Sequence, residues 1–405
     1  IDTLLPLFDL LLPLEGPYSV RGRFADKADR IILDELAIAS GQSDIGGEII
    51  VYRSQERPRL EAALHSDQIY LRELIPDRES AAAAREQGRV IPDYELPIEQ
   101  LLGFDAELVF KGKRLRTEFG DLGYINFRLS LQDGVFRLAP FRVRGWAGAL
   151  VDVDVGIDAS QDPPRIDAEL IARDLDYGLL LRQAGVAETV DGRLDVTARL
   201  SGTGRTRYEF LADADGQFTV VGKDGRIASR RLDLWGADLI TTMLSRNWRA
   251  ADVTQINCLV ARLSIVDGIA ISDDLLVDTQ RISIGAAGTL NLNTEEIDLV
   301  FVPQPKRASL VSLTNPVRVT GTLSRPKVSV TVLPGSRVRV LAGLINPAYL
   351  LFALSSMGSG EDNPCLVAVN AAVEVQGEAD PLPPIETEAP ADFSPFAGCS
   401  SVLRR

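Results

Sequence analysis

The stretch from Leu150 to Asp158, LVDVDVGID, alternates apolar and acidic residues. Its apolar positions are Val151, Val153, Val155 and Ile157, and its acidic positions are Asp152, Asp154 and Asp158. Successive side chains of a β-strand point to opposite faces of a sheet. The stretch therefore predicts a strand with one apolar face and one solvated face.

The same alternation recurs along much of the chain. Its apolar positions include Ile125, Phe127 and Leu129, then Leu194, Val196 and Leu200, then Ile282 and Ile284, and finally Val328 and Val330. Each of these runs predicts another one-sided strand. Together with the four apolar residues of 150–158, these residues are the candidates for one continuous apolar surface.

Asp-Gly pairs stand between many of the alternating runs. They are Asp133-Gly134, Asp191-Gly192, Asp215-Gly216, Asp224-Gly225 and Asp267-Gly268. Asp-Gly suits tight turns that need a positive φ, and between alternating runs it indicates a hairpin. The pairs therefore predict a long antiparallel meander and argue against a parallel β-helix.

Helical patterns are few. Apolar residues at three- and four-residue spacing predict helices over about 175–184 and 232–245, and 67–87 reads as a helical insert with a loop. The segment 340–357 contains an uncharged run broken by Asn346-Pro347, which predicts a cap on the sheet or a contact with a membrane. We thus expect one β-rich region over 1–376 and an acidic, proline-rich tail over 377–405.

A sheet with this much one-sided character must cover its apolar face. We expect a mostly β fold in which a long, twisted, mainly antiparallel sheet, with a few short helices, curls into an apolar groove or partial barrel. A closed sandwich without a ligand is the alternative that the pattern leaves open.

Charge and chemistry narrow the function. Lys and Arg number 43 against 57 Asp and Glu, a net charge of −14, which disfavours binding to nucleic acid. The single histidine, His65, and the absence of phosphate-loop, nucleophile-elbow or zinc-site spacing favour a protein that is not an enzyme, with no catalytic residue, no metal and no cofactor. The aspartates of 150–158 are most simply the solvated face of their strand.

The chain has three cysteines. Cys365 and Cys399 flank the acidic tail, so we expect a disulfide between them. Cys258 lies in the strand-like run QINCLVARL. There we expect it to remain free, as a small buried apolar side chain.

Three stretches resemble the AsmA-like family of envelope proteins. The first, Arg30 to Leu74, contains a Gly-Gln-Ser-Asp turn within 41–47; the second, Phe104 to Ile157, contains the basic segment KGKRL; the third, Leu211 to Arg307, ends near LVFVPQPK. The resemblance covers most of residues 18–335. It implies a β-groove in the periplasm, an inner-membrane anchor that would lie outside this sequence, and a role in outer-membrane maintenance.

The resemblance also implies a ligand. We expect passive handling of glycerophospholipid and its transfer toward the outer membrane, with envelope proteins as possible partners. The first rival is an assembly scaffold for outer-membrane proteins that pairs client strands at its sheet edges. A carbohydrate-active β enzyme is a weaker rival, because aromatic residues make up only 6% of the chain.

Overall fold

The computed structural model describes residues 18–53, 57–70, 88–91, 93, 95–117, 120–146, 148–183, 190–228, 253–280, 282–305 and 316–330. Its dominant feature is a sheet of 17 strands. These strands are β1 (Tyr18–Asp26), β2 (Arg30–Ser40), β3 (Ser43–Tyr52), β4 (Arg59–Ser66), β6 (Asp105–Gly112), β9 (Ile125–Gln132), β10 (Val135–Trp146), β11 (Ala149–Asp158), β12 (Arg165–Asp176), β13 (Val190–Thr203), β14 (Asp215–Ala228), β15 (Val253–Val266), β16 (Ile269–Thr279), β17 (Ile282–Asn291), β18 (Glu296–Pro305), β19 (Val317–Thr322) and β20 (Arg325–Val330).

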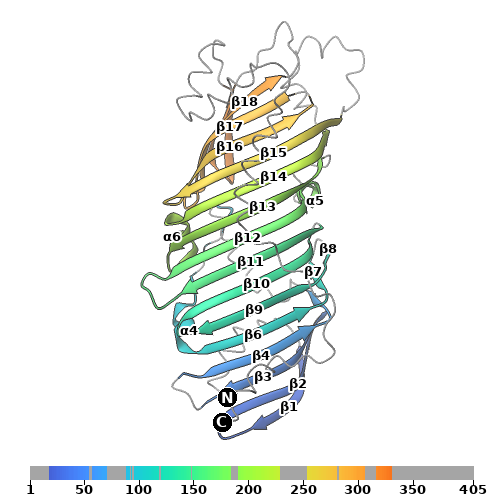
Figure 1. The fold of residues 1–405 in the computed structure, drawn as a ribbon, viewed down its shortest axis with the longest axis vertical. Coiled ribbons are helices and arrows are strands. Elements are labelled where there is room, and N and C mark those ends of the chain that lie inside the picture. Colours follow the sequence, from blue (N-terminus) through green and yellow to red (C-terminus); the bar gives the residue numbers. More distant parts are fainter. Residues whose placement is uncertain are drawn as a thin grey trace, which may run out of the picture.

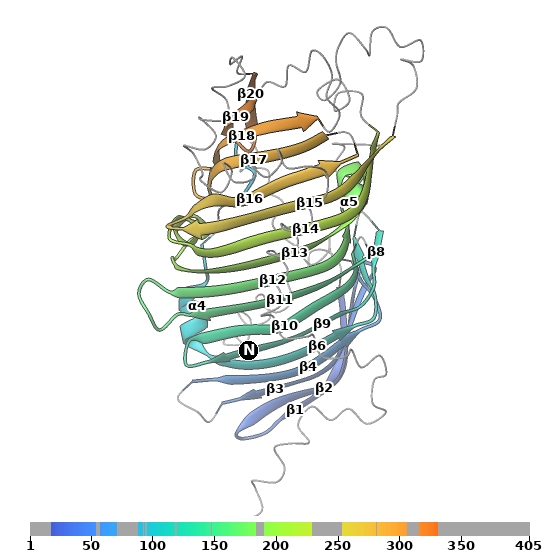
Figure 2. The same cartoon turned by 45° about the horizontal axis from the view of Figure 1, so that its top comes forward.

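The strands lie in chain order, each hydrogen-bonded to the next. Every pairing is antiparallel except that of β4 with β6, which is parallel. Strands β1 and β20 lie at the two ends of the sheet, so the sheet is open and is not a closed barrel. Figures 1 and 2 show it as one long, twisted and curled layer. The predicted fold class is confirmed.

A small second sheet extends the middle of the large one. It contains β5 (Ile69–Tyr70), β7 (Leu115–Thr117) and β8 (Gly120–Leu122). In the chain, β5 follows β4, β7 follows β6, and β8 precedes β9. The chain therefore bends out of the large sheet at the ends of β4 and β6, and we call this bend the corner of the sheet. The residues predicted to begin a helical insert at 67 include β5, so that part of the prediction is wrong; residues 71–87 lie outside the described ranges.

The described ranges contain three short helices, which lie beside the ends of the strands. Helices α4 (Ile98–Gly103) and α6 (Arg207–Ala212) lie along one edge, and α5 (Tyr177–Gln183) lies at the other (Figure 1). The helix expected over 175–184 coincides with α5, whereas α4 and α6 were not foreseen. The segments 232–245, 340–357 and 377–405 lie outside the described residues.

Two of the Asp-Gly pairs form the predicted hairpin turns. Asp133 and Gly134 join β9 to β10 with φ of 52° and 80°, and Asp267 and Gly268 join β15 to β16 with φ of 47° and 70°. The other three pairs lie inside β13 and β14, so they were wrongly predicted as turns. Their glycines serve bulges and close strand packing instead: a Cβ on Gly216 would lie 1.9 Å from the carbonyl oxygen of Arg199.

Cys258 is disulfide-bonded. The expectation that it stays free is therefore wrong. Cys365 and Cys399, between which a bridge was expected, lie outside the described residues. Spacing along the chain carries no information about this pairing, since residues far apart in sequence meet in the fold.

Candidate functional site

One face of the sheet is apolar from end to end. The strand register carries a row of side chains from Leu33 in β2 to Ile297 in β18. In order of position across the sheet, the row is Leu33, Ile49, Ala62, Leu108, Leu129, Leu138, Val155, Ala168, Leu200, Gly216, Ile265, Ala270, Leu290 and Ile297. No polar side chain interrupts this row. We call this side of the sheet the apolar face.

The candidate residues predicted from sequence share this face. Register places Ile125, Phe127 and Leu129 of β9 beside β10, and through it beside Val151, Val153, Val155 and Ile157 of β11. Leu194, Val196 and Leu200 of β13, Ile282 and Ile284 of β17 and Val328 of β20 follow in the same register. Val330 is placed by its backbone alone, opposite Val317.

Burial divides the apolar face into two parts. Toward β2–β11 its side chains form a packed core: Ile49 and Ala62 are 2% exposed, and Val151 is 9% exposed. Across β12–β15 the corresponding side chains of Leu170, Ala198, Phe218 and Leu263 are only half-buried. Phe218 and Leu263 pack against a small buried cluster of Ala214, Ile265 and Ala270, and β12–β15 is on the whole less buried than β2–β11. We call β12–β15 the open section.

Stacked aromatic rings fill the packed part. Phe110 and Phe127 pair across β6 and β9 with ring centroids 5.1 Å apart, and Phe127 stacks on Phe141 of β10 at 5.8 Å. Val153 pairs with Phe141 and packs against this core. It therefore belongs to the border of the packed core.

The opposite face carries charge in cross-strand pairs. Arg142 bonds Asp152 at 2.9 Å, Arg199 bonds Glu169 at 2.7 Å. Arg262 lies 2.6 Å from Asp274 across β15 and β16. Alternating signs on neighbouring strands favour the observed register, because a slip of one residue would turn these charges toward the apolar face.

Asp154 lies on the charged face without such a partner ion. Partial burial raises the pKa of its carboxyl group above the ordinary value, Arg137 opposes the change, and the nearby carboxylates of Glu169 and Asp152 add to it. Asp154 is exposed, which fits its predicted place on the solvated face.

The Gly-Gln-Ser-Asp stretch has a structural role at the corner of the sheet. The Asp44 carboxylate accepts hydrogen bonds from the backbone nitrogens of Gln68 at 2.7 Å and Asp67 at 3.1 Å. The Ser43 hydroxyl accepts one from the nitrogen of Tyr70 at 2.9 Å. These bonds hold the bend between β4 and β5, so the motif serves the fold.

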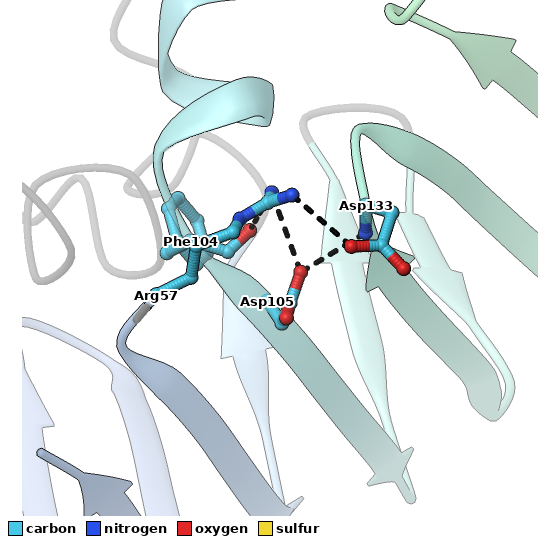
Figure 3. Close-up of polar contacts among 4 residues, drawn as sticks. All are labelled: Arg57, Phe104, Asp105 and Asp133. Atoms are coloured by element: carbon cyan, nitrogen blue, oxygen red, sulfur yellow. Dashed lines mark hydrogen bonds and ion pairs between the residues drawn. The ribbon is translucent and has the colours of Figure 1, made fainter. Parts of the chain in front are cut away.

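Arg57 fastens the start of β6 to the edge that carries α4 (Figure 3). Its guanidinium lies 3.3 Å from the Asp105 carboxylate and 3.4 Å from Asp133, and it donates to the carbonyl oxygen of Phe104 at 3.2 Å. Asp105 also accepts from the backbone nitrogen of Asp133 at 3.0 Å. Every charge here has a partner within the cluster, as expected of a structural clamp.

In the described part of the chain, no group of three or more His, Cys, Asp or Glu side chains could hold a metal ion. His65 is exposed on β4. Across the ranges that the structure describes, no helix is long and apolar enough to cross a membrane.

Comparison with known proteins identifies the family of this chain. The model of the AsmA family matches residues 36–275, more than half of the chain, and the chain belongs to that family. It is 26% identical over 396 residues to the AsmA family protein YhjG of Escherichia coli, covering 90% of this chain and 57% of that protein. It is 20% identical over 308 residues to Protein AsmA of the same organism, covering 71% of this chain and 49% of that protein. No solved structure matches.

The chain thus spans about half the length of the curated relatives that it matches. Membership of the family suggests a function connected with the cell envelope.

Proposed function

We propose that the chain binds the acyl chains of glycerophospholipid on the open section of its apolar face and passes them along the sheet toward the outer membrane. The observation that carries this proposal is the uninterrupted apolar row through fourteen positions of successive strands, half-buried at its positions in β12, β13 and β14. A face of this kind in contact with water is unfavourable, so it marks a site of interaction.

The energetics favour passive transfer. Burial of an acyl chain contributes about 0.8 kcal/mol per CH₂, close to what the same chain has in a bilayer. An apolar face therefore need only lower the barrier to crossing water, and the proposal involves binding without catalysis and without a cofactor. The headgroup stays in solvent.

The proposal also includes a location in the periplasm. The disulfide at Cys258 is typical of an oxidising compartment, which supports the periplasm. An inner-membrane anchor outside this sequence would hold the protein there, as the family resemblance implies.

Native mass spectrometry of the 405-residue chain after incubation with phosphatidylethanolamine vesicles tests the proposal. We expect one or more phospholipids bound per chain, displaced by detergent at the open section. A chain that takes up no phospholipid, while it retains its β-sheet circular dichroism, would overturn it.

A second function is favoured by the free edges of the sheet. Val20 and Phe24 of β1 are 56% and 62% exposed, on a strand that, among the described residues, pairs with β2 alone. Such an edge can pair with a strand of an outer-membrane client protein. Retention of client β-strand peptides by the chain, lost when Phe24 is replaced by Lys, would favour this scaffold function over the lipid proposal.

A further inference from the structure

The connection between β4 and β6 reaches the far end of the sheet before it returns. Its residues 88–97, described except for 92 and 94, are named the strap. Gly88 accepts a hydrogen bond from the Ser324 hydroxyl in the turn between β19 and β20. Arg89 donates to the carbonyl oxygen of Asn293 at 2.9 Å, in the turn between β17 and β18. The strap therefore begins against strands that lie more than 200 positions later in the chain.

Glu295 is the main attachment of this end. Its side chain is 1% exposed, and its carboxylate accepts from the backbone nitrogens of Val90 at 2.8 Å and Ile91 at 2.8 Å. Its own φ is 60°, the left-handed region in which turns usually place glycine. A buried carboxylate held in this conformation, with backbone amides of a distant segment as its partners, indicates that the contact is specific.

The middle of the strap lies against α6. The Arg89 guanidinium lies 3.8 Å from the ring centroid of Tyr208, and the Tyr208 hydroxyl donates to the carbonyl oxygen of Ile91 at 2.9 Å. The backbone nitrogen of Leu96 donates to the carbonyl oxygen of Arg205 at 2.9 Å. These contacts hold the strap along the same edge as the turns that it reaches.

The strap ends in α4, which is fixed to the core. Leu101 is 5% exposed within the main core. Leu102 lies against Gly134 in the turn between β9 and β10, where an added Cβ would come within 2.8 Å of its Cδ2 atom. Both ends of the strap are therefore attached to turns on one edge of the sheet.

The strap is about as long as the row of strand ends that it spans. Fully extended, Gly88 to Pro97 reaches about 31 Å, and the helix to Leu102 adds about 8 Å. Ten strand spacings separate the β9–β10 turn from the β19–β20 turn, or about 48 Å along a flat sheet. The side-chain contacts at its two ends extend this reach, so the strap can span the two turns only with little slack.

We propose that the strap is a tie that sets the curvature of the sheet, with the Glu295 carboxylate as its lock. When the lock is released, β17–β20 can swing away from β9–β12, and the apolar face opens. The curvature of this sheet is then a consequence of the crossover connection as well as of strand twist.

The test uses the full 405-residue chain with two spin labels, introduced through unnatural amino acids at the exposed positions Gln132 in β9 and Lys327 in β20. In Glu295→Ala we expect the distance between the labels to lengthen by up to about 10 Å and its distribution to broaden. Hydrogen exchange at the Val90 and Ile91 amides should accelerate at least tenfold. Glu296→Ala, an exposed neighbour in the same turn, is the matched control and should change neither quantity.

Two results would overturn the proposal: strap amides that stay protected in Glu295→Ala, or strap amides that exchange freely while the distance between the labels is unchanged. If Glu295→Ala does not fold, Tyr208→Phe provides the second variant. It removes only the donor to Ile91 and should give a smaller acceleration of exchange and a smaller lengthening; no change in either quantity would count against the tie.

Discussion

Arg142 donates from Nε to the Asp152 carboxylate at 2.9 Å, directly across β10 and β11. Their side chains are 19% and 12% exposed, although both lie on the charged face of the sheet. The pair is therefore largely removed from water, unlike most ion pairs on that face.

Removal of one partner should be costly at this position. We expect Arg142→Ala to lower the free energy of unfolding by about 2 kcal/mol, because Asp152 keeps its charge with little solvent to replace the guanidinium. Arg165→Ala is the control, since its pair with Asp167 is about half exposed and screened by solvent, and it should leave stability nearly unchanged. Urea denaturation of both variants measures the difference, and equal effects would contradict it.

A charge on the open section should expel lipid. Leu200 lies on the apolar face, is half-buried and packs against the small cluster of Ala214, Ile265 and Ala270, away from the stacked aromatic rings. Leu200→Asp should reduce bound phospholipid per chain at least tenfold, because a carboxylate among acyl chains is strongly disfavoured, while the sheet remains folded. The control, Gln217→Asp, places the same charge one strand away on the opposite face and should leave binding unchanged.

Two aspartates should respond to pH in opposite directions. A hydrogen bond from Arg318 lowers the pKa of Asp298, so its ionised form stabilises the fold above the ordinary pKa of Asp, and this contribution disappears as the pH falls through the lowered value. Burial raises the pKa of Asp154, so its ionised form destabilises the fold at neutral pH. Asp298→Asn should therefore lower stability at pH 7 and Asp154→Asn should raise it. Both differences should vanish in denaturation experiments well below about pH 3.

Gly47 should tolerate no side chain. Its φ is 143°, and a Cβ there would lie 2.1 Å from the carbonyl oxygen of Ala63 on the neighbouring strand. Gly47→Ala should cost about 3 kcal/mol through backbone strain and the displacement of β4. At Gly156 nothing lies within 4 Å of the added carbon, so Gly156→Ala should be neutral or slightly stabilising. Thermal denaturation of both variants measures the difference.

Peptide mapping under non-reducing conditions should find Cys258 linked to another cysteine peptide of the same chain. Reduction should lower the free energy of unfolding by about 2–4 kcal/mol, because the bond restricts the unfolded chain. A peptide carrying Cys365 joined to Cys399, with Cys258 alkylated, would contradict the structure.

Alternation along single strands was enough to predict the sheet and to assign its faces. In a strand such as 150–158 the alternation of apolar and acidic residues identifies the two faces, and the register of its neighbours follows because apolar residues must share one face. The division of the apolar face into packed and open parts could not be predicted this way. Phe127 and Leu200 look alike in sequence, and only the stacking of Phe127 between Phe110 and Phe141 separates them.

The strap and the disulfide were missed for a related reason. Residues 88–97 have neither helical nor strand periodicity, and their partners lie about 205 positions away. Glu295 in isolation is an ordinary acidic turn residue; its role depends on amides that its own neighbourhood does not contain. Asp191-Gly192 failed as a turn signal because Gly192, with φ of 157°, stays within an extended strand.

From β9 to β20 the neighbours of each strand in the sheet are its neighbours in the chain. Such an array lengthens by whole hairpins, each adding about 10 Å without altering the cross-section of the rest. Insertion or loss of a hairpin during evolution would therefore change the length of the sheet in fixed increments. The distance between two membranes is a property that this kind of increment could match.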